Sequence, residues 1–132
     1  SLFFQLDEEN YKKVLDVIKV INLENKKNYI AKKLSHGEKQ WLEIGMLLMQ
    51  QPELLLIDEP AAGMTEKETL NTSNLLKNIS RDRTVIVVEH DMKFVENLKV
   101  EVVVLHEGSV LTNGPMSEVK RNKDVIDVYL GR

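Results

Sequence analysis

Two adjacent carboxylates, Asp58 and Glu59, directly follow a run of four aliphatic residues, Leu54 to Ile57. An uninterrupted apolar run of this length, bounded by turn residues, is typical of a strand buried on both faces of a parallel sheet. Pro60 lacks a backbone N–H and is expected to end the strand. Ligands of open α/β sheets gather at the carboxyl ends of strands, so this acid pair is a candidate to hold a cation or act as a general base. An ordinary acidic loop is the alternative.

The cluster Glu89-His90-Asp91 follows a second aliphatic strand, Thr84 to Val88. Between the two strands, the capping-box spacing of Thr65 and Glu68 opens a helix. Two buried strands joined by a helix form a right-handed parallel crossover, which places both strand ends at one edge of the sheet. We therefore expect Asp58, Glu59 and His90 to converge. A lone histidine at a strand end is more often a hydrogen-bonded structural residue, but its pairing with the acid dyad favours a functional role.

A third candidate is the segment Leu34-Ser35-His36-Gly37-Glu38, which leads into a helical pattern. A serine, a glycine that admits another group close to the backbone, and the unpaired N–H groups of a helix amino terminus together make an anion site. An ordinary serine cap is the alternative, and the segment taken alone favours it. The apolar residues that follow cover most of the helix circumference and predict a buried helix with Trp41 in the core: Trp41, Leu42, Ile44, Met46, Leu47, Leu48 and Met49.

Composition narrows the class of protein. The 132 residues, 42% of them hydrophobic, suffice for one small domain with a core, and the alternation of strands and helices predicts an α/β fold. With 18 basic and 21 acidic side chains and no long basic stretch, general nucleic-acid binding is not expected. The absence of cysteine excludes disulfides and zinc ribbons and agrees with a reducing, cytosolic compartment. We find no signal peptide and no apolar run long enough to cross a bilayer.

The remaining elements follow from periodicity and turn residues. An acidic start at Asp7 opens an amphipathic helix that extends to Ile21, and residues 22–33 form a connector whose pairs Lys26-Lys27 and Lys32-Lys33 are expected to be solvated. His106 is expected to be structural. Later elements are a helix over 92–98, a strand over 102–105, a turn at Glu107-Gly108, an antiparallel strand over 109–112, a break at Gly114-Pro115, a short helix capped by Ser117, and a terminal helix marked by Val125, Val128 and Tyr129.

Residues 34–38 resemble the LSGGQ signature of ATP-binding-cassette ATPases, and a Walker B strand, a small-residue D-loop and a switch histidine follow at the family's spacing. Ala62 to Met64 and Glu89 to Met92 are similar to the branched-chain amino-acid importer group, and the fuller match, which extends to Tyr129-Leu130-Gly131-Arg132, is similar to its urea-type subunits. The resemblance implies a partial P-loop NTPase, with a parallel sheet flanked by helices and a remnant of the helical subdomain. Residues 1–50 would end that subdomain and carry the signature, and 51–132 would belong to the catalytic, RecA-like subdomain.

The resemblance also implies roles for the candidate residues. Asp58 would hold Mg²⁺ through water, Glu59 would polarise the water that attacks the γ-phosphate, and His90 would sense that phosphate. The signature would bind ATP held by an opposite subunit, which makes each site composite, and the D-loop from Ala61 to Thr65 would lie along the dimer interface. The residues expected to contact this nucleotide are Leu34, Ser35, His36, Gly37 and Glu38.

The sequence departs from the family pattern in three ways. His36 stands in place of the first signature glycine, and Glu38 in place of the glutamine, so the contacts of both side chains are open. No Gly-x-x-x-x-Gly-Lys-[Ser/Thr] sequence occurs, which indicates the carboxyl-terminal part of a longer ATPase that does not turn over ATP by itself. In the family the missing strand lies between strands 84–88 and 102–105. We expect the chain to close that gap, to swap a strand, or to dimerise through it.

The favoured function is that of the ATP-hydrolysing subunit of a bacterial importer for urea, short amides or branched-chain amino acids, using ATP and Mg²⁺. Such a subunit would work as a dimer with a second ATPase subunit beneath a membrane permease, at the inner face of the plasma membrane, and would serve an external solute-binding protein indirectly. The alternatives are a DNA-repair or chromosome-structure ATPase and a non-catalytic fragment that lends its signature surface to a partner. A metal hydrolase using Asp58, Glu59 and His90 is a further alternative that the family spacing disfavours.

Overall fold

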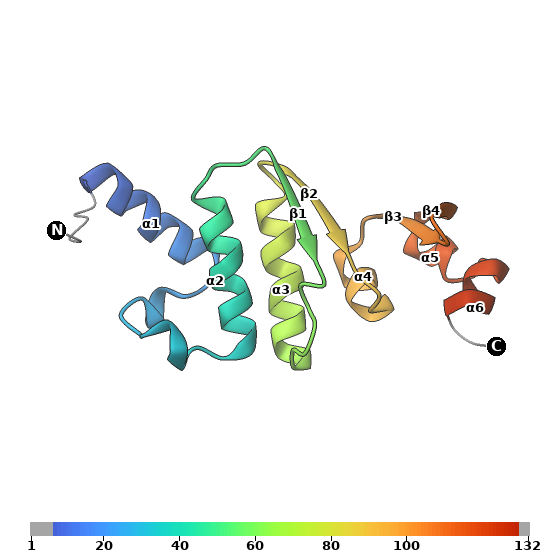
Figure 1. The fold of residues 1–132 in the computed structure, drawn as a ribbon, viewed down its shortest axis with the longest axis horizontal. Helices are drawn as coiled ribbons and strands as arrows, with labels where there is room; N and C mark the ends of the chain where they lie inside the picture. The colour runs from blue at the N-terminus through green and yellow to red at the C-terminus, as the bar shows by residue number, and fades with distance from the viewer. Residues whose placement is uncertain (1–6, 130–132) are drawn as a thin grey trace. The chain divides into compact units, whose positions relative to one another are not determined.

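The computed structural model describes residues 7–129, and these fall into two compact units, Ser1–Val88 and Glu89–Arg132. Figure 1 shows their elements. The part of the predicted resemblance that covers Leu130 to Arg132 lies outside the described residues. The predicted subdomain boundary at residue 50 is a different division from the one after Val88 and stays a prediction. No helix between residues 7 and 129 combines the length and apolarity needed to cross a membrane.

Residues 7–88 of the first unit contain three helices, two short 3-10 turns and a two-stranded sheet. Asp7 caps its first helix by accepting a hydrogen bond from the Asn10 N–H at 2.7 Å, as the acidic start predicted. The 3-10 turns fall inside the predicted connector 22–33. In chain order the elements are α1 (Glu8–Val20), η1 (Glu24–Lys26), η2 (Ala31–Lys33), α2 (His36–Leu48), β1 (Leu54–Asp58), α3 (Glu66–Ile79) and β2 (Thr84–Val88).

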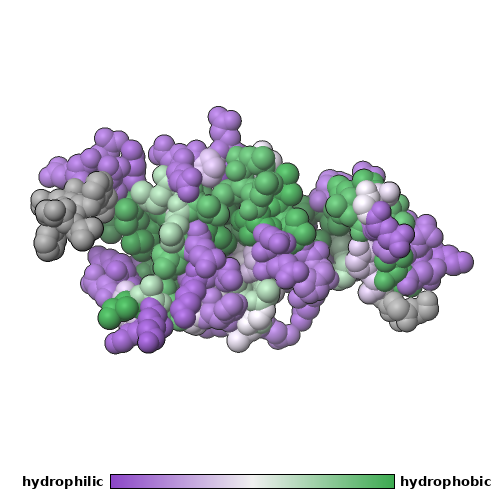
Figure 2. Space-filling model, in the orientation of Figure 1, coloured by the Kyte–Doolittle hydropathy of each residue, from purple (hydrophilic) through white to green (hydrophobic). Residues whose placement is uncertain are grey.

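Strands β1 and β2 are parallel neighbours, with Leu54 paired to Thr84 and Asp58 paired to Val88. The predicted parallel pairing across helix α3 is thus confirmed. The prediction that both faces of these strands are buried is wrong for the described chain. Residues of β1 alternate between buried and exposed, and on the open face Leu56 is 68% exposed. The apolar run matched two-sided burial, but no described element of the first unit covers the second face, which contributes to the hydrophobic surface in Figure 2.

The two sheets of the described chain contain two strands each, β1 with β2 and β3 with β4. Within the first unit, strand β2 has β1 as its neighbour. All three expected responses to the missing strand, namely closure of the gap, a strand swap and dimerisation, stay predictions.

Helix α2 buries one face only, which corrects the prediction of a buried helix. Trp41 lies in the core as expected, and its Nε1–H donates to the Thr72 hydroxyl at 2.8 Å, which fixes α2 against α3. Met46 on the other face is 64% exposed. Gly45 allows α1 to approach, because a Cβ at this glycine would lie 2.7 Å from the Ile21 Cδ1 atom.

The second unit contains α4 (Met92–Leu98), an antiparallel hairpin of β3 (Glu101–His106) and β4 (Ser109–Pro115), α5 (Met116–Val119) and α6 (Lys123–Tyr129). Its core is built by Val104, Met116, Val119 and Val125. Strand β4 extends past its predicted end at residue 112 and ends at Pro115, so the predicted break at Gly114-Pro115 falls on its last two residues. Ser117 lies inside α5, whose N-cap position is Pro115, so the predicted serine cap is wrong. Proline suits this place because its fixed φ and missing N–H cost a helix start nothing.

Candidate functional site

The predicted acid pair lies at the carboxyl end of β1. Asp58 is the last residue of the strand and is exposed. Glu59 adopts a left-handed conformation with φ of 45°, which is rare for a residue with a side chain. Its N–H donates to the Val88 carbonyl at 2.9 Å and its carbonyl accepts from the Ala62 N–H at 3.1 Å. The turn is therefore held from both sides, and the Glu59 side chain leaves it exposed to solvent.

His90 belongs to the second unit, where its side chain is 73% exposed. The neighbouring Glu89 side chain accepts hydrogen bonds from the backbone N–H groups of His90 at 3.0 Å and Asp91 at 3.2 Å. Asp91 in turn caps α4 through the Phe94 N–H at 3.0 Å. The backbone at the end of β2 is thus fixed by local carboxylates. The convergence of His90 with Asp58 and Glu59 stays a prediction.

The predicted signature segment caps α2 with both halves of a capping box. The Ser35 hydroxyl accepts from the Glu38 N–H at 3.2 Å, and the Glu38 Oε2 atom accepts from the Ser35 N–H at 2.9 Å. The other oxygen of Glu38 binds the Lys26 ammonium. This lysine, and after it the Ser35 N–H, lowers the pKa of Glu38. The sequence predicted that Lys26 is solvated, whereas in the structure it pairs with Glu38. Lys26 thus neutralises the negative charge of the residue that stands in place of the family glutamine.

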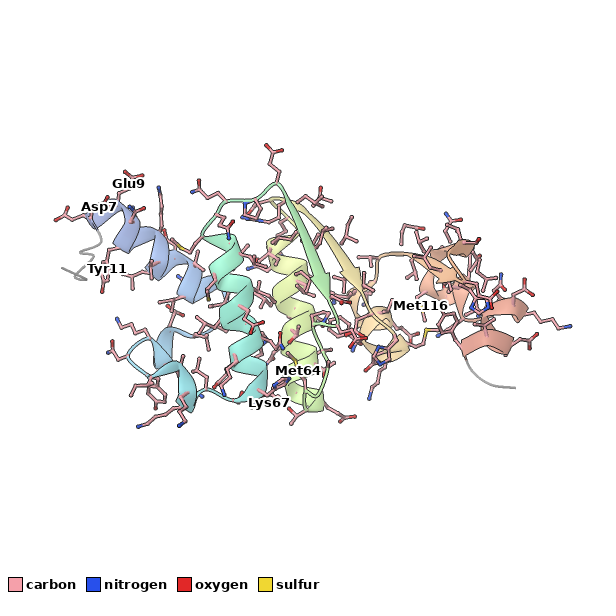
Figure 3. All side chains as sticks on the ribbon, in the orientation of Figure 1. Asp7, Glu9, Tyr11, Met64, Lys67 and Met116 are labelled. Carbon is pink, nitrogen blue, oxygen red and sulfur yellow. The ribbon has the colours of Figure 1, made fainter. Side chains whose placement is uncertain are left out.

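The second capping box, at the start of α3, reaches the first. Glu68 accepts from the Thr65 N–H at 3.0 Å and the Thr65 hydroxyl at 2.9 Å through its Oε2 atom. Its Oε1 atom accepts a hydrogen bond from the Ser35 hydroxyl at 2.8 Å. The helices α2 and α3 begin side by side in Figure 1, and Met64 and Lys67 mark this end of α3 in Figure 3. One carboxylate thus connects the starts of both helices.

Gly37 lies directly beneath the Glu68 carboxylate. A Cβ on Gly37 would lie 2.8 Å from the Glu68 Oε1 atom, so the close approach requires that glycine or a displaced carboxylate. The pKa of Glu68 is lowered by the Thr65 N–H first, then by the hydroxyls of Ser35 and Thr65, with a further contribution from the Gly37 backbone. The predicted anion-binding groups of the signature therefore already contact an anionic oxygen, supplied by the chain itself.

His36 contacts the loop that follows the acid pair. Its Nε2 atom lies 3.0 Å from the Ala62 carbonyl oxygen, within hydrogen-bonding distance. Gly63 lies beside the same ring and has φ of 69°, a conformation that suits glycine. Leu34, the remaining member of the predicted set, is buried. The contact of His36, left open by the sequence, is thus with the segment predicted to be the D-loop.

Two residues at this site were missed as site residues from the sequence. Glu68 was recognised only as part of a capping box, and Lys26 only as part of a charged connector. The single signal for Glu68 was its position at N3 of a helix that follows the acid pair, which gave no reason to expect a second helix within reach. Among residues 7–129 no group of three or more His, Cys, Asp or Glu side chains is placed to hold a metal ion. Asp58 as a lone carboxylate ligand stays a prediction.

Comparison with known proteins gives consistent matches. A profile of the ABC transporter family matches residues 5–62. The high-affinity branched-chain amino acid transport ATP-binding protein LivG of Salmonella typhimurium is 39% identical over 106 residues, which cover 79% of this chain and 42% of LivG. The corresponding protein BraF of Pseudomonas aeruginosa is 37% identical over 113 residues, covering 84% of this chain and 44% of BraF. The methionine import ATP-binding protein MetN of Desulfitobacterium hafniense is 32% identical over 127 residues, covering 90% of this chain and 37% of MetN.

The fold agrees with these sequence matches. The ATP-binding cassette MJ1267 of an ABC transporter, in its ADP conformation, superposes with a TM-score of 0.87 at 24% identity and covers 100% of this chain and 54% of MJ1267. The chain spans less than half the length of the sequence relatives above. The predicted α/β class and partial P-loop NTPase fold are confirmed.

Proposed function

The chain belongs to the ABC transporter family of ATP-binding proteins, and on this basis we propose that it supplies the signature half of a composite ATP site. The observation that carries this proposal is the convergence of the Ser35 hydroxyl and the Gly37 backbone on an anionic oxygen. A γ-phosphate oxygen, like that carboxylate oxygen, is an anionic acceptor for hydroxyl and backbone N–H donors. The nucleotide itself is held by a second subunit that carries a phosphate-binding loop.

The acid pair has a separate role, at a nucleotide on its own side of the dimer and not at the ATP that Ser35 contacts; the phosphate-binding loop for that nucleotide does not occur in residues 1–132. Asp58 is an exposed carboxylate at a strand end, which suits a Mg²⁺ ion that keeps most of its waters and needs few protein ligands. The bound ion would neutralise charge on the phosphates. Glu59 orients and polarises the attacking water, and His90 donates to the γ-phosphate. The fixed turn at Glu59 supports this role, because a held backbone limits the positions of the carboxylate.

We assign the assembly to bacterial import, at the inner face of the plasma membrane, through a permease and indirectly an external solute-binding protein. The related proteins LivG and BraF are named for branched-chain amino acids, which supports that solute class over urea or short amides. The related protein MetN is named for methionine, so methionine is the competing solute. These relatives are importer subunits, which does not favour the DNA-repair alternative. Transport assays of the assembled importer with labelled leucine, methionine and urea distinguish the three solutes.

The chain alone does not turn over ATP in this proposal, because it contains no Gly-x-x-x-x-Gly-Lys-[Ser/Thr] sequence to cradle the phosphates. It associates instead with an intact ATP-binding subunit when that subunit holds ATP. Sedimentation velocity of the chain mixed with purified LivG, in Mg-ATP and in Mg-ADP, measures this. We expect a complex in ATP that is weaker in ADP and is lost in Ser35→Ala.

Ser117→Ala is the matched control, because it removes an exposed serine hydroxyl from α5, outside the signature segment. Equal association in ATP and ADP, or a complex that Ser35→Ala leaves intact, would contradict the composite site. A steady ATPase rate of the pure chain that Glu59→Gln abolishes would contradict the statement that the chain is inactive alone. A complex that forms in ATP without any hydrolysis attributable to Glu59 would favour the non-catalytic alternative.

A further inference from the structure

The Ser35 hydroxyl of this chain already donates its proton. A serine hydroxyl has one O–H to donate, and here it points to the Glu68 Oε1 atom at 2.8 Å. The same hydroxyl accepts from the Glu38 N–H, so its accepting side is engaged in the helix cap. A phosphate oxygen therefore cannot receive this proton until Glu68 releases it.

The space above Gly37 is occupied as well. The Glu68 carboxylate lies so close that a Cβ at Gly37 would be 2.8 Å from Oε1 and 2.9 Å from Cδ. An incoming phosphate oxygen needs the volume that this carboxylate fills, because a glycine at this place serves to let an anion approach the backbone. The carboxylate is also negatively charged at neutral pH and would repel a triphosphate beside it.

Release of Ser35 leaves the start of α3 capped. The Oε1 atom of Glu68 reaches Ser35, while Oε2 accepts from the Thr65 N–H at 3.0 Å and the Thr65 hydroxyl at 2.9 Å. A rotation that withdraws Oε1 also moves Oε2, because both atoms are bonded to Cδ, but the Glu68 N–H still donates to the Thr65 hydroxyl at 3.3 Å and keeps this half of the cap.

We propose that Glu68 is a resident competitor for the signature anion site: its carboxylate holds the Ser35 hydroxyl and covers Gly37 until a tetrahedral oxyanion displaces it. The identification of that oxyanion as the γ-phosphate rests on the proposed function. The competition itself rests only on contacts within this chain. Glu68 acts through Ser35 and Gly37 and is a positioning residue. Its removal is expected to strengthen anion binding, whereas removal of a residue that merely supports the fold would weaken it.

The test measures anion binding at Gly37 by NMR. The amide signals of Ser35 and Gly37 are followed while sodium sulfate, a tetrahedral anion of constant charge, is added against sodium chloride at equal ionic strength. In Glu68→Gln we expect a saturable shift of the Gly37 amide, with a half-saturating sulfate concentration at least about tenfold below that of the wild-type chain, the fold-change of one lost charge-assisted hydrogen bond. Glutamine keeps the capping box, so the helix start survives.

Glu66→Gln is the matched control, because it removes the same charge from the same first turn of α3. It is expected to behave like the wild-type chain. Glu68→Ala provides a second variant that needs no substitute side chain, and it is expected to shift sulfate binding in the same direction. Equal sulfate responses in the wild-type chain and both Glu68 variants, or an equal gain in Glu66→Gln, would overturn the proposal, and so would weaker binding without Glu68.

The outcome separates this inference from the proposed function. Tighter sulfate binding in the Glu68 variants, without an ATP-dependent complex with LivG, would support the proposal that Glu68 competes for the anion site and would contradict the composite ATP site. An ATP-dependent complex with unchanged sulfate binding in the Glu68 variants would support the composite ATP site and contradict the competition by Glu68. If both hold, Glu68→Gln is expected to tighten the complex in Mg-ATP by about the same tenfold factor.

Discussion

Helices α2 and α3 begin with the same four-residue pattern but use it differently. Ser35 with Glu38 and Thr65 with Glu68 both close complete capping boxes. The second oxygen of Glu38 binds Lys26, which belongs to the segment just before its own helix. The second oxygen of Glu68 crosses to Ser35 on the other helix. The pattern thus decides the backbone contacts of each cap, whereas the packing of the two helices decides what the remaining oxygen binds.

The largest effect is expected from separating the two helices at their core. Trp41→Ala removes a buried indole and its 2.8 Å hydrogen bond to Thr72. The free energy of unfolding should fall by about 3–5 kcal/mol, as measured by urea denaturation, because a large buried side chain is lost. The cap at α3 should survive as a local structure, whereas the contact between Glu68 and Ser35 should be lost with the packing.

Met46→Ala serves as its control, since this residue lies on the exposed face of the same helix. Its effect on the free energy of unfolding should stay within about 0.5 kcal/mol. Comparable losses in the two variants would mean that α2 is not held against α3 by its tryptophan face.

A smaller effect is expected from the caps themselves. Ser35→Ala and Thr65→Ala should each lower the free energy of unfolding by about 1 kcal/mol. Double-mutant cycles with Glu38→Ala and Glu68→Ala then distinguish the boxes. Ser35 should couple to both glutamates by at least about 0.5 kcal/mol each, and Thr65 to Glu68 alone. Measurable coupling between Thr65 and Glu38 would contradict the one-way reach of Glu68 from α3 to α2.

The smallest effect concerns pH. The pKa values of Glu38 and Glu68 are both lowered in the folded chain, so their contributions to stability are present above the ordinary pKa of glutamate and are lost as the pH falls through the lowered values. Lys26→Met should raise the pKa of Glu38, whose largest stabilising contact it removes, and leave that of Glu68 unchanged. Carboxyl-carbon NMR titration measures both. A rise in the pKa of both Glu38 and Glu68 in Lys26→Met would show that the two capping boxes titrate as one network.

Much of the first unit could be predicted because its signals are local. The start of α3, the strands β1 and β2 and the parallel pairing followed from capping, aliphatic runs and topology, and the structure confirms them. Trp41 was correctly placed in the core. The caps were also visible from the sequence, since a capping box involves residues only three apart.

The contacts between distant segments could not be predicted in this way. Glu68 reaches Ser35 across 33 positions of the chain, and His36 reaches Ala62 across 26. Nothing in either short pattern specifies such a partner. The prediction that both faces of β1 are buried was wrong for a different reason. Apolar residues indicate that burial of a face would be favourable, but they do not show that a neighbouring element is present. The same limit applied to α2, whose apolar circumference suggested burial on all sides.

The open face of the sheet formed by β1 and β2 also affects how strongly this chain adsorbs to surfaces in dilute solution. Leu54, Leu56, Ile86 and Val88 turn their aliphatic side chains to water from two adjacent strands. Such a surface makes the chain surface-active: it should adsorb to air–water interfaces and plastic, and bind a phenyl resin more tightly than its net charge of -3 suggests. Dilute samples will therefore lose protein to vessel walls, and a trace of nonionic detergent should restore it.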